Sequence, residues 1–151
     1  LNGYGDVEFI ETLPSFNLPF PELPKDRTYR IFQIKGDSML PVQPNSYIIC
    51  SYVEDWTNIK NDQRCIVVSK SEGIVFKRLL NASNQGYFTL KSDNPEYEPY
   101  NIHLNDVIEI WRAEGVTQFG FESDQKLINN LLYQELSEIK SEIATLKQKL
   151  D

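Results

Sequence analysis

The chain is poor in the residues that most often build metal sites. Its 151 residues include one histidine and two cysteines, and no Cys-x-x-Cys pair occurs, so we expect neither a metal nor a cofactor. No signal peptide is recognisable, and no apolar run approaches the ~20 residues that a membrane-spanning helix needs. We therefore expect a cytoplasmic protein without a membrane partner.

Positive charge is also scarce. The 15 Lys and Arg residues are outnumbered by 22 Asp and Glu residues, which gives a net charge of −7. A body of this sign repels the phosphate backbone, so the chain alone is expected to bind nucleic acid poorly. Cys50 and Cys65 lie in separate apolar runs, and we expect both to be reduced, buried thiols.

The residues that are present in quantity favour β-structure. Eight Tyr, eight Phe and two Trp accompany runs rich in Ile and Val, and such residues are typical of strands. Turn-forming segments, "KSEG" and "NASNQG" among them, separate the runs. This spacing predicts an all-β barrel or sandwich. The expected strands are Tyr29–Ile34, Tyr47–Val53, Cys65–Ser69, Ile74–Leu80, Tyr87–Lys91 and Val107–Trp111, with a last apolar piece ending at Phe121.

Both ends of the chain differ from this β-region. Residues 1–28 contain Pro14, Pro19, Pro21 and Pro24, which favour an extended arm. Residues 122–151 contain no Gly or Pro. We therefore expect three parts: an arm or linker over 1–28, a β-domain over 29–121 and a helix over 122–151.

The carboxy-terminal part has a heptad pattern. Apolar residues recur at steps of 4, 3, 4, 3 and 4 from Leu132, which predicts a coiled-coil helix from about Asp124 to Leu150, with Ser123 or Asp124 as N-cap. Asn129 falls at an a position. An amphipathic helix that folds back on its own domain is the alternative. The heptad residues are Leu132, Leu136, Ile139, Ile143, Leu146 and Leu150.

One short segment, "KGDSMLP" at Lys35–Pro41, follows a strand-like run. Its serine, Ser38, either caps a turn or acts as a nucleophile. A serine nucleophile needs a base, and His103 lies in a polar, loop-like context. Lys77 lies in "GIVFKRLL", where an apolar setting can keep a lysine neutral. An edge-strand lysine that deters aggregation is the alternative.

Three motifs together resemble the carboxy-terminal domain of LexA-type repressors: "GDSMLP", a lysine 39 residues later in "VFKRL", and "LKSDNPEYEP". The resemblance covers roughly Tyr29 to Trp111. These domains are self-cleaving serine–lysine peptidases whose bent antiparallel β-fold is shared with type I signal peptidases. The resemblance implies that Ser38 is the nucleophile, that Lys77 is the general base and that the backbone N–H groups of Asp37 and Ser38 form an oxyanion hole.

The family's members usually dimerise and carry an amino-terminal helix-turn-helix domain. The resemblance therefore implies a homodimer, formed here through the β-domain and the carboxy-terminal helix, that contacts DNA only through a domain missing from this chain. The family's usual scissile bonds, Ala-Gly and Cys-Gly, do not occur. The chain begins at Leu1 rather than Met, and we expect it to start after the linker of a longer protein. The heptad tail is an addition to the family pattern.

Three functions fit these features. The first is the sensor, dimerisation and latent self-cleaving domain of a transcriptional repressor. The second is a non-proteolytic dimerisation or ligand-sensing domain of a regulator. The third is a processing enzyme similar to signal peptidase, which would need a membrane anchor. An upstream helix-turn-helix would favour the first two, and an upstream transmembrane helix would favour the third.

Overall fold

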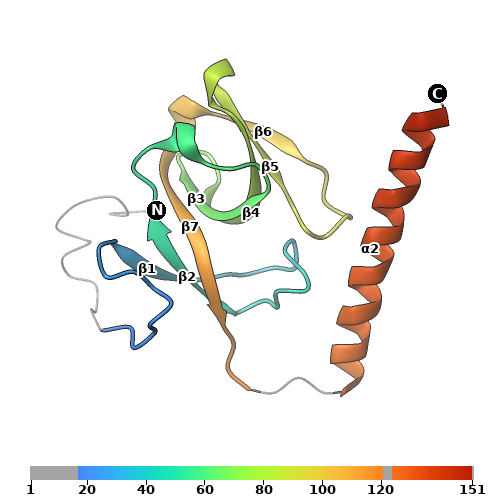
Figure 1. The fold of residues 1–151 in the computed structure, drawn as a ribbon, viewed down its shortest axis with the longest axis horizontal. Coiled ribbons are helices and arrows are strands. Elements are labelled where there is room, and N and C mark those ends of the chain that lie inside the picture. The colour runs from blue at the N-terminus through green and yellow to red at the C-terminus, as the bar shows by residue number, and fades with distance from the viewer. Residues whose placement is uncertain (1–16, 121–123, 151) are drawn as a thin grey trace.

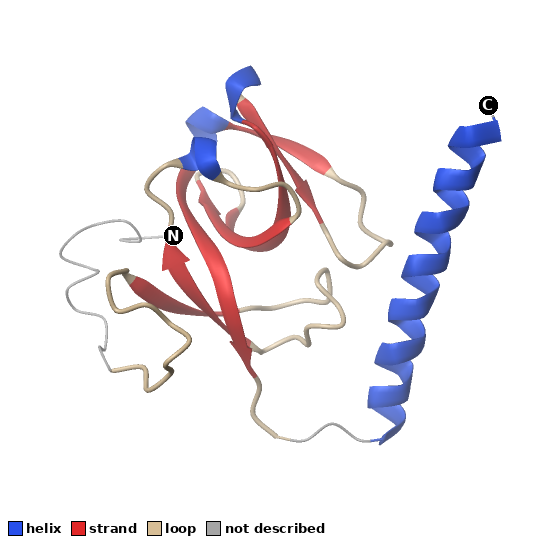
Figure 2. Ribbon diagram, in the orientation of Figure 1, coloured by secondary structure: helices blue, strands red, loops and turns tan. Residues whose placement is uncertain are grey.

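The computed structural model describes residues 17–120 and 124–150. This part of the chain folds into a seven-stranded antiparallel body beside one long helix (Figures 1 and 2), which confirms the mainly β expectation. The strands are β1 Tyr29–Gln33, β2 Tyr47–Tyr52, β3 Gln63–Ser69, β4 Gly73–Ala82, β5 Tyr87–Lys91, β6 Tyr100–His103 and β7 Val107–Thr117; short 3-10 turns cover Trp56–Asn58, Ser83–Gln85 and Leu104–Asp106; the helix is α2, Asp124–Leu150.

Two long strands bend the sheet. Its order is β1-β2-β7-β3-β4-β5-β6. Residues 107–112 of β7 pair with β3, and residues 111–117 pair with β2. In the same way β4 pairs with β3 through residues 73–79 and with β5 through residues 78–82. Each long strand thus joins two differently oriented parts of the sheet, which gives the bent architecture of a LexA-like fold.

The central strand β3 is buried on both faces. Successive side chains of a strand point to opposite faces, and here Ile66 and Val68 enter one apolar cluster while Cys65 and Val67 enter a second. Phe32, Met39 and Phe76 also belong to the first cluster, which lies next to the turn that carries Ser38. The Ser38 region is therefore built on a packed core.

The sequence pattern missed one strand and shortened three others, β7 most of all. β6 has the sequence "YNIH", in which only Ile102 is buried, and four residues are too few for a clear alternation. β7 continues past Trp111 to Thr117. Beyond β7, Phe119 is 81% exposed, so it adds nothing to the core. Residues 1–16, which make up most of the expected arm, and Phe121 lie outside the described residues.

The carboxy-terminal helix is present as the heptad pattern predicted. Its apolar residues do not pack on the β-body, since Leu136, Ile143 and Leu150 are 58%, 47% and 87% exposed. These three residues of the apolar stripe therefore face away from the β-body. α2 runs beside the β-body (Figure 1) and contacts it through polar residues instead. The side chains of the expected N-caps, Ser123 and Asp124, are outside the described part.

Candidate active site

Ser38 lies on a tight turn that follows β1. Gly36 has φ +76°, a left-handed conformation that glycine adopts without the steric cost of a Cβ. Leu40 N–H then donates to the Asp37 carbonyl at 3.4 Å, and Val42 N–H donates to the Met39 carbonyl at 2.9 Å. We call residues 36–41 the Ser38 turn. The half-buried Ser38 side chain is thus carried by consecutive turns rather than by a flexible loop.

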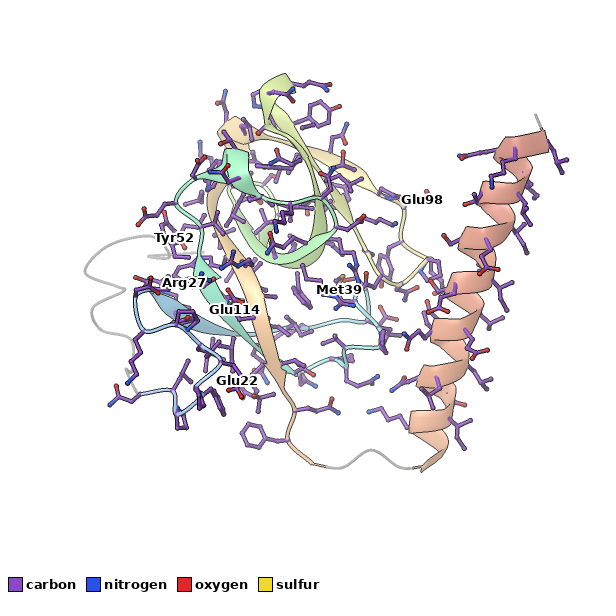
Figure 3. All side chains as sticks on the ribbon, viewed as in Figure 1. Glu22, Arg27, Met39, Tyr52, Glu98 and Glu114 are labelled. Atoms are coloured by element: carbon purple, nitrogen blue, oxygen red, sulfur yellow. The ribbon has the colours of Figure 1, made fainter. Side chains whose placement is uncertain are left out.

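The side chain of Met39 anchors this turn. It is 2% exposed and belongs to the first apolar cluster. Its sulfur accepts a hydrogen bond from Asp93 N–H at 3.4 Å. Figure 3 labels Met39 on the side of the β-body that faces α2. The methionine beside the candidate nucleophile therefore has a packing role, and it fixes the turn against the core.

A second loop holds the Ser38 turn from outside. This Asn94 loop (residues 92–97) follows β5. The backbone N–H of Asn94 donates to the Ser38 carbonyl at 3.0 Å, and its side-chain Nδ2 donates to the Asp37 carbonyl at 3.1 Å. Tyr97 Oη donates to Asp37 Oδ1 at 2.6 Å. Three hydrogen bonds thus hold the carbonyls of Asp37 and Ser38 and the side chain of Asp37.

Lys77 lies in the middle of β4 and is 7% exposed. Strand alternation predicted that it would share a face with the apolar Val75 and Leu79. Leu79 belongs to the second apolar cluster, and the partly buried Val75 packs against it. Burial lowers the pKa of Lys77, because desolvation disfavours the charged amine; the carboxylate of Glu72 opposes this shift. The apolar setting inferred from "GIVFKRLL" is therefore observed.

The Lys77 amine has two neighbours that the sequence pattern did not reveal. Nζ donates to Ser92 Oγ at 2.8 Å, and Ser92 is itself 6% exposed. Nζ also lies 5.5 Å from the centre of the Tyr97 ring, within the range of a cation–π contact. Ser92, Asn94 and Tyr97 all lie in "LKSDNPEYEP". That segment contributed to the resemblance, but the role of each of its residues depends on contacts with distant parts of the chain.

One cleft brings Ser38 and Lys77 together. It has a volume of about 460 Å³ and is lined by both residues. Its walls are the end of β1, the Ser38 turn and residues 74–77 of β4. Within the described residues the Lys77 amine forms its hydrogen bond with Ser92 and none with Ser38. No hydrogen bond from the backbone N–H groups of Asp37 and Ser38 is found within residues 17–120 and 124–150.

Arg78 follows Lys77 in β4, and the surroundings of these two basic side chains differ. Its guanidinium pairs with Asp93, which also binds Arg64 at 3.0 Å. Arg78 is thus neutralised by a carboxylate, whereas Lys77 is hydrogen-bonded to a neutral hydroxyl. Of these two adjacent basic residues, only Lys77 occupies a setting that favours the uncharged form.

The other titratable candidates have structural roles. His103 is exposed, and its Nδ1 accepts a hydrogen bond from Asn105 N–H at 3.1 Å, which caps the short turn after β6. Cys50 and Cys65 are free and buried, as expected. Burial raises the pKa of both thiols, that of Cys65 to about 12. Thiols in this state are poor nucleophiles at neutral pH.

In the part of the chain that the structure describes, no group of three His, Cys, Asp or Glu side chains is placed to hold a metal ion. Among the same residues, no helix has the length and apolar character needed to cross a bilayer.

Comparison with known proteins identifies the family. No curated protein matches the chain significantly. The model of the Peptidase S24-like family matches residues 4–115, a range that contains Ser38, Lys77 and strands β1 to β6. This range is more than half of the 151 residues, and the bent antiparallel body is the LexA-like fold expected of such a domain. The chain therefore belongs to the Peptidase S24-like family.

Proposed function

We propose that this domain is the latent self-cleaving and dimerisation module of a transcriptional repressor, with Ser38 as nucleophile and Lys77 as general base. The observation that carries the proposal is the shared cleft: a serine on a rigid turn and a buried lysine with a lowered pKa line the same cavity. Membership of the Peptidase S24-like family supports the same chemistry.

The neutral Lys77 amine has two N–H bonds and one lone pair. One N–H donates to Ser92, and the lone pair is then available for the Ser38 proton. Hydrogen bonds between catalytic groups are often long before substrate binds and tighten in the complex. The Ser92 bond therefore orients the lysine without occupying the pair of electrons that a base uses.

The reaction follows from these positions. Lys77 takes the proton of Ser38 Oγ as this oxygen attacks the carbonyl carbon of the scissile peptide. The N–H groups of Asp37 and Ser38 stabilise the negative charge that develops on the carbonyl oxygen; such fixed donors contribute ~3–4 kcal/mol each in a comparable site. Lys77 then gives its proton to the leaving amine. Water attacks the resulting ester, and Lys77 again acts as the base.

The cleft suits an extended peptide. β1 pairs only with β2, and residues 73–77 of β4 pair only with β3, so each strand leaves one edge open within the described sheet. Residues 31–36 and 74–77 both line the cleft. An extended segment can add its backbone hydrogen bonds to such edges. We therefore propose that the substrate is an extended linker of the same protein.

The helix supplies the proposed dimer contact. The α2 seam, defined as the exposed residues Leu132, Leu136, Ile139, Ile143, Leu146 and Leu150, has the heptad spacing of a coiled coil. In a parallel pair, Glu135 and Glu142 of one chain face Lys140 and Lys147 of the other. Asn129 at an a position favours two strands in register. Three heptads are marginal alone, so the β-body contributes to the interface as well.

Dimerisation gives self-cleavage its regulatory effect. A repressor dimer holds two DNA-binding domains on one operator, and linking two binding modules can raise avidity by ~10²–10⁴. Here those domains are helix-turn-helix units outside the 151 residues. Cleavage between them and this module abolishes the advantage and releases the operator.

A non-proteolytic regulator module is the second candidate. It is favoured by one observation, namely that the Lys77 amine hydrogen-bonds Ser92 rather than Ser38. In this case the cleft would bind a ligand or peptide without cutting it, and the α2 seam would still form the dimer.

Peptide cleavage separates the two candidates. The chain is incubated at alkaline pH with extended peptides that contain an Ala-Gly or Cys-Gly bond, and products are identified by mass spectrometry. We expect cleavage that is lost in Ser38→Ala and in Lys77→Ala. Cleavage retained in either variant would assign the reaction to other residues. Binding without cleavage in the unmodified chain would favour the non-proteolytic module. Without peptide, the 151-residue chain should stay intact.

A further inference from the structure

We propose that α2 is a clamp on the candidate active site, and that Tyr133 and Asn94 are positioning residues that hold the Ser38 turn in its reactive geometry. This inference rests on the proposed function of Ser38, but its structural part can be tested separately. It assigns to the helix a role besides dimerisation, and the two roles use different faces of the helix.

Asn94 is where the contacts converge. It is 1% exposed, and all its polar groups are used. The backbone N–H and Nδ2 hold the carbonyls of Ser38 and Asp37. Oδ1 accepts one hydrogen bond from Glu96 N–H at 2.9 Å and another from the hydroxyl of Tyr133 on α2. One buried amide therefore links the helix to both residues of the proposed oxyanion hole.

A second contact fixes the other end of the turn. Gln43 is 5% exposed, and its Nε2 donates to the Pro41 carbonyl at 3.2 Å and to Asn130 Oδ1 on α2 at 3.0 Å. Asn130 and Tyr133 are three residues apart and therefore lie on one helix face. Ser137, four residues further, is also partly buried. The helix thus contacts the Ser38 turn through a polar face at two points.

A cavity marks where this face lies. The cavity lies between α2, the Ser38 turn and the β-body. It is lined by Tyr133, Gln134, Ser137 and Glu138 of α2, by Leu40 and Pro41 of the Ser38 turn, and by Arg64, Arg78 and Asp93 of the β-body. The α2 seam is absent from this lining. The seam residues are 47–87% exposed. A second chain can therefore bind the seam while the polar face stays on the active site.

The consequence is a link between assembly and reactivity. An oxyanion hole works because its donors are fixed before the reaction, and a small displacement of reacting groups can lower a rate ~100-fold. A helix held straight by a coiled-coil partner keeps Tyr133 and Asn130 in register with Asn94 and Gln43. Pairing of α2 should thus favour the reactive form of the Ser38 turn.

The test uses the full chain, the variant Tyr133→Phe and the matched control Tyr87→Phe. Both changes delete one hydroxyl, but the Tyr87 hydroxyl donates to the exposed Gln85 side chain at 3.2 Å, away from the Ser38 turn. Hydrogen exchange of the backbone N–H of Asn94 reports directly on the hydrogen bond that this group donates to the Ser38 carbonyl. We expect roughly tenfold faster exchange in Tyr133→Phe, the effect of losing one buried hydrogen bond, and no change in Tyr87→Phe.

A second readout follows Ser38 itself. Its Oγ attacks the phosphorus of a fluorophosphonate, fluoride leaves, and Lys77 takes the proton. Tyr133→Phe should slow this labelling several-fold without moving its pH midpoint, because Lys77 is unchanged. Tyr87→Phe should be labelled at the same rate as the parent chain. Thermal unfolding of both variants identifies any general loss of folding.

The outcomes are distinguishable. Unchanged Asn94 exchange in Tyr133→Phe, or equal acceleration in both variants, would overturn the clamp. Faster exchange in Tyr133→Phe alone supports it. If Ser38 is not labelled even in the parent chain, the proposed peptidase function fails while the exchange result still decides whether α2 holds the turn. A shifted pH midpoint would mean that Tyr133 acts on Lys77 and would contradict a positioning role on the Ser38 turn.

Discussion

The β-body buries its apolar side chains, whereas the α2 seam exposes them. In β3, Ile66, Val67 and Val68 are fully buried, whereas Leu132, Leu136 and Leu146 of α2 are 57–58% exposed. Full burial of one such side chain contributes roughly 1.5–3 kcal/mol. The β-body therefore carries its own stability, while the helix leaves most of its apolar surface available to a partner. A large exposed apolar stripe on a soluble domain commonly marks an interaction site.

The largest expected effect concerns the core of the β-body. Leu79 is fully buried in β4 beside Lys77, and Leu79→Ala should lower the free energy of unfolding by about 2–5 kcal/mol. The matched change Leu136→Ala on α2 removes the same atoms from a 58% exposed side chain. In dilute solution it should cost less than about 1 kcal/mol. Urea unfolding of both variants measures this, and equal losses would show that the seam is buried.

Removal of α2 should weaken self-association while the β-body stays folded. A chain ending at Phe121 lacks α2 and should keep the β-sheet signal of the body in circular dichroism. Its self-association should be at least about 100-fold weaker, which is ~2.7 kcal/mol, since the α2 seam is gone. Sedimentation over a range of concentrations gives the dissociation constants. Equally tight association of the truncated chain would mean that α2 is not the dimer contact.

These two regions also differed in how far the sequence predicted them. The heptads of α2 and the runs of branched and aromatic residues in β1 to β5 are local patterns, and the structure contains all of these elements. β6 was missed because "YNIH" offers one buried residue. Within the site, Lys77 stood out because most residues around it in "GIVFKRLL" are apolar. Ser38 stood out because a glycine and a proline flank its turn.

The residues around that site could not be identified in the same way. Asn94 contacts Asp37 across 57 positions of sequence and Tyr133 across 39, and Ser92 contacts Lys77 from the start of the loop after β5. Nothing in the local pattern of "LKSDNPEYEP" states which partner each side chain has. Such roles depend on the bend of the sheet and on where α2 docks, and both are set by packing over long sequence distances.

A smaller effect is expected when Lys77 is replaced by an apolar residue. Lys77→Met keeps the length of the side chain and removes the cost of burying an amine, so stability at neutral pH should be unchanged or up to ~1–2 kcal/mol higher. Arg78→Met is the matched control; it leaves Asp93 without this partner and should be destabilising. A large loss of stability in Lys77→Met would show that the charged lysine is a structural group.

The same variant tests the direction of the pKa shift. Because burial lowers the pKa of Lys77 in the folded chain, the unfolded chain binds more protons between that lowered pKa and the ordinary lysine value of 10.5. Stability should therefore rise with pH through this window in the parent chain. In Lys77→Met this contribution disappears. Thermal unfolding at a series of alkaline pH values measures the difference, and identical slopes would contradict a lowered pKa.

The smallest effect concerns the two thiols. Cys50 and Cys65 are both fully buried, and burial raises the pKa of each. Native protein should therefore react with a thiol reagent only as fast as the β-body opens, and both thiols should react at once in denaturant. Rapid reaction of the native chain would show that the sheet between β2 and β3 is less protected than its packing indicates.

The proposed function requires Lys77 to activate Ser38, and covalent labelling of Ser38 measures this activation. The intact chain and Lys77→Met are treated with a fluorophosphonate across neutral and alkaline pH, and the modified residue is located by peptide mass spectrometry. We expect one adduct, on Ser38, which forms faster as pH rises because Lys77 must be neutral to accept the proton, and which is nearly absent in Lys77→Met. An adduct on another serine, or equal labelling of Ser38 in both proteins, would contradict it.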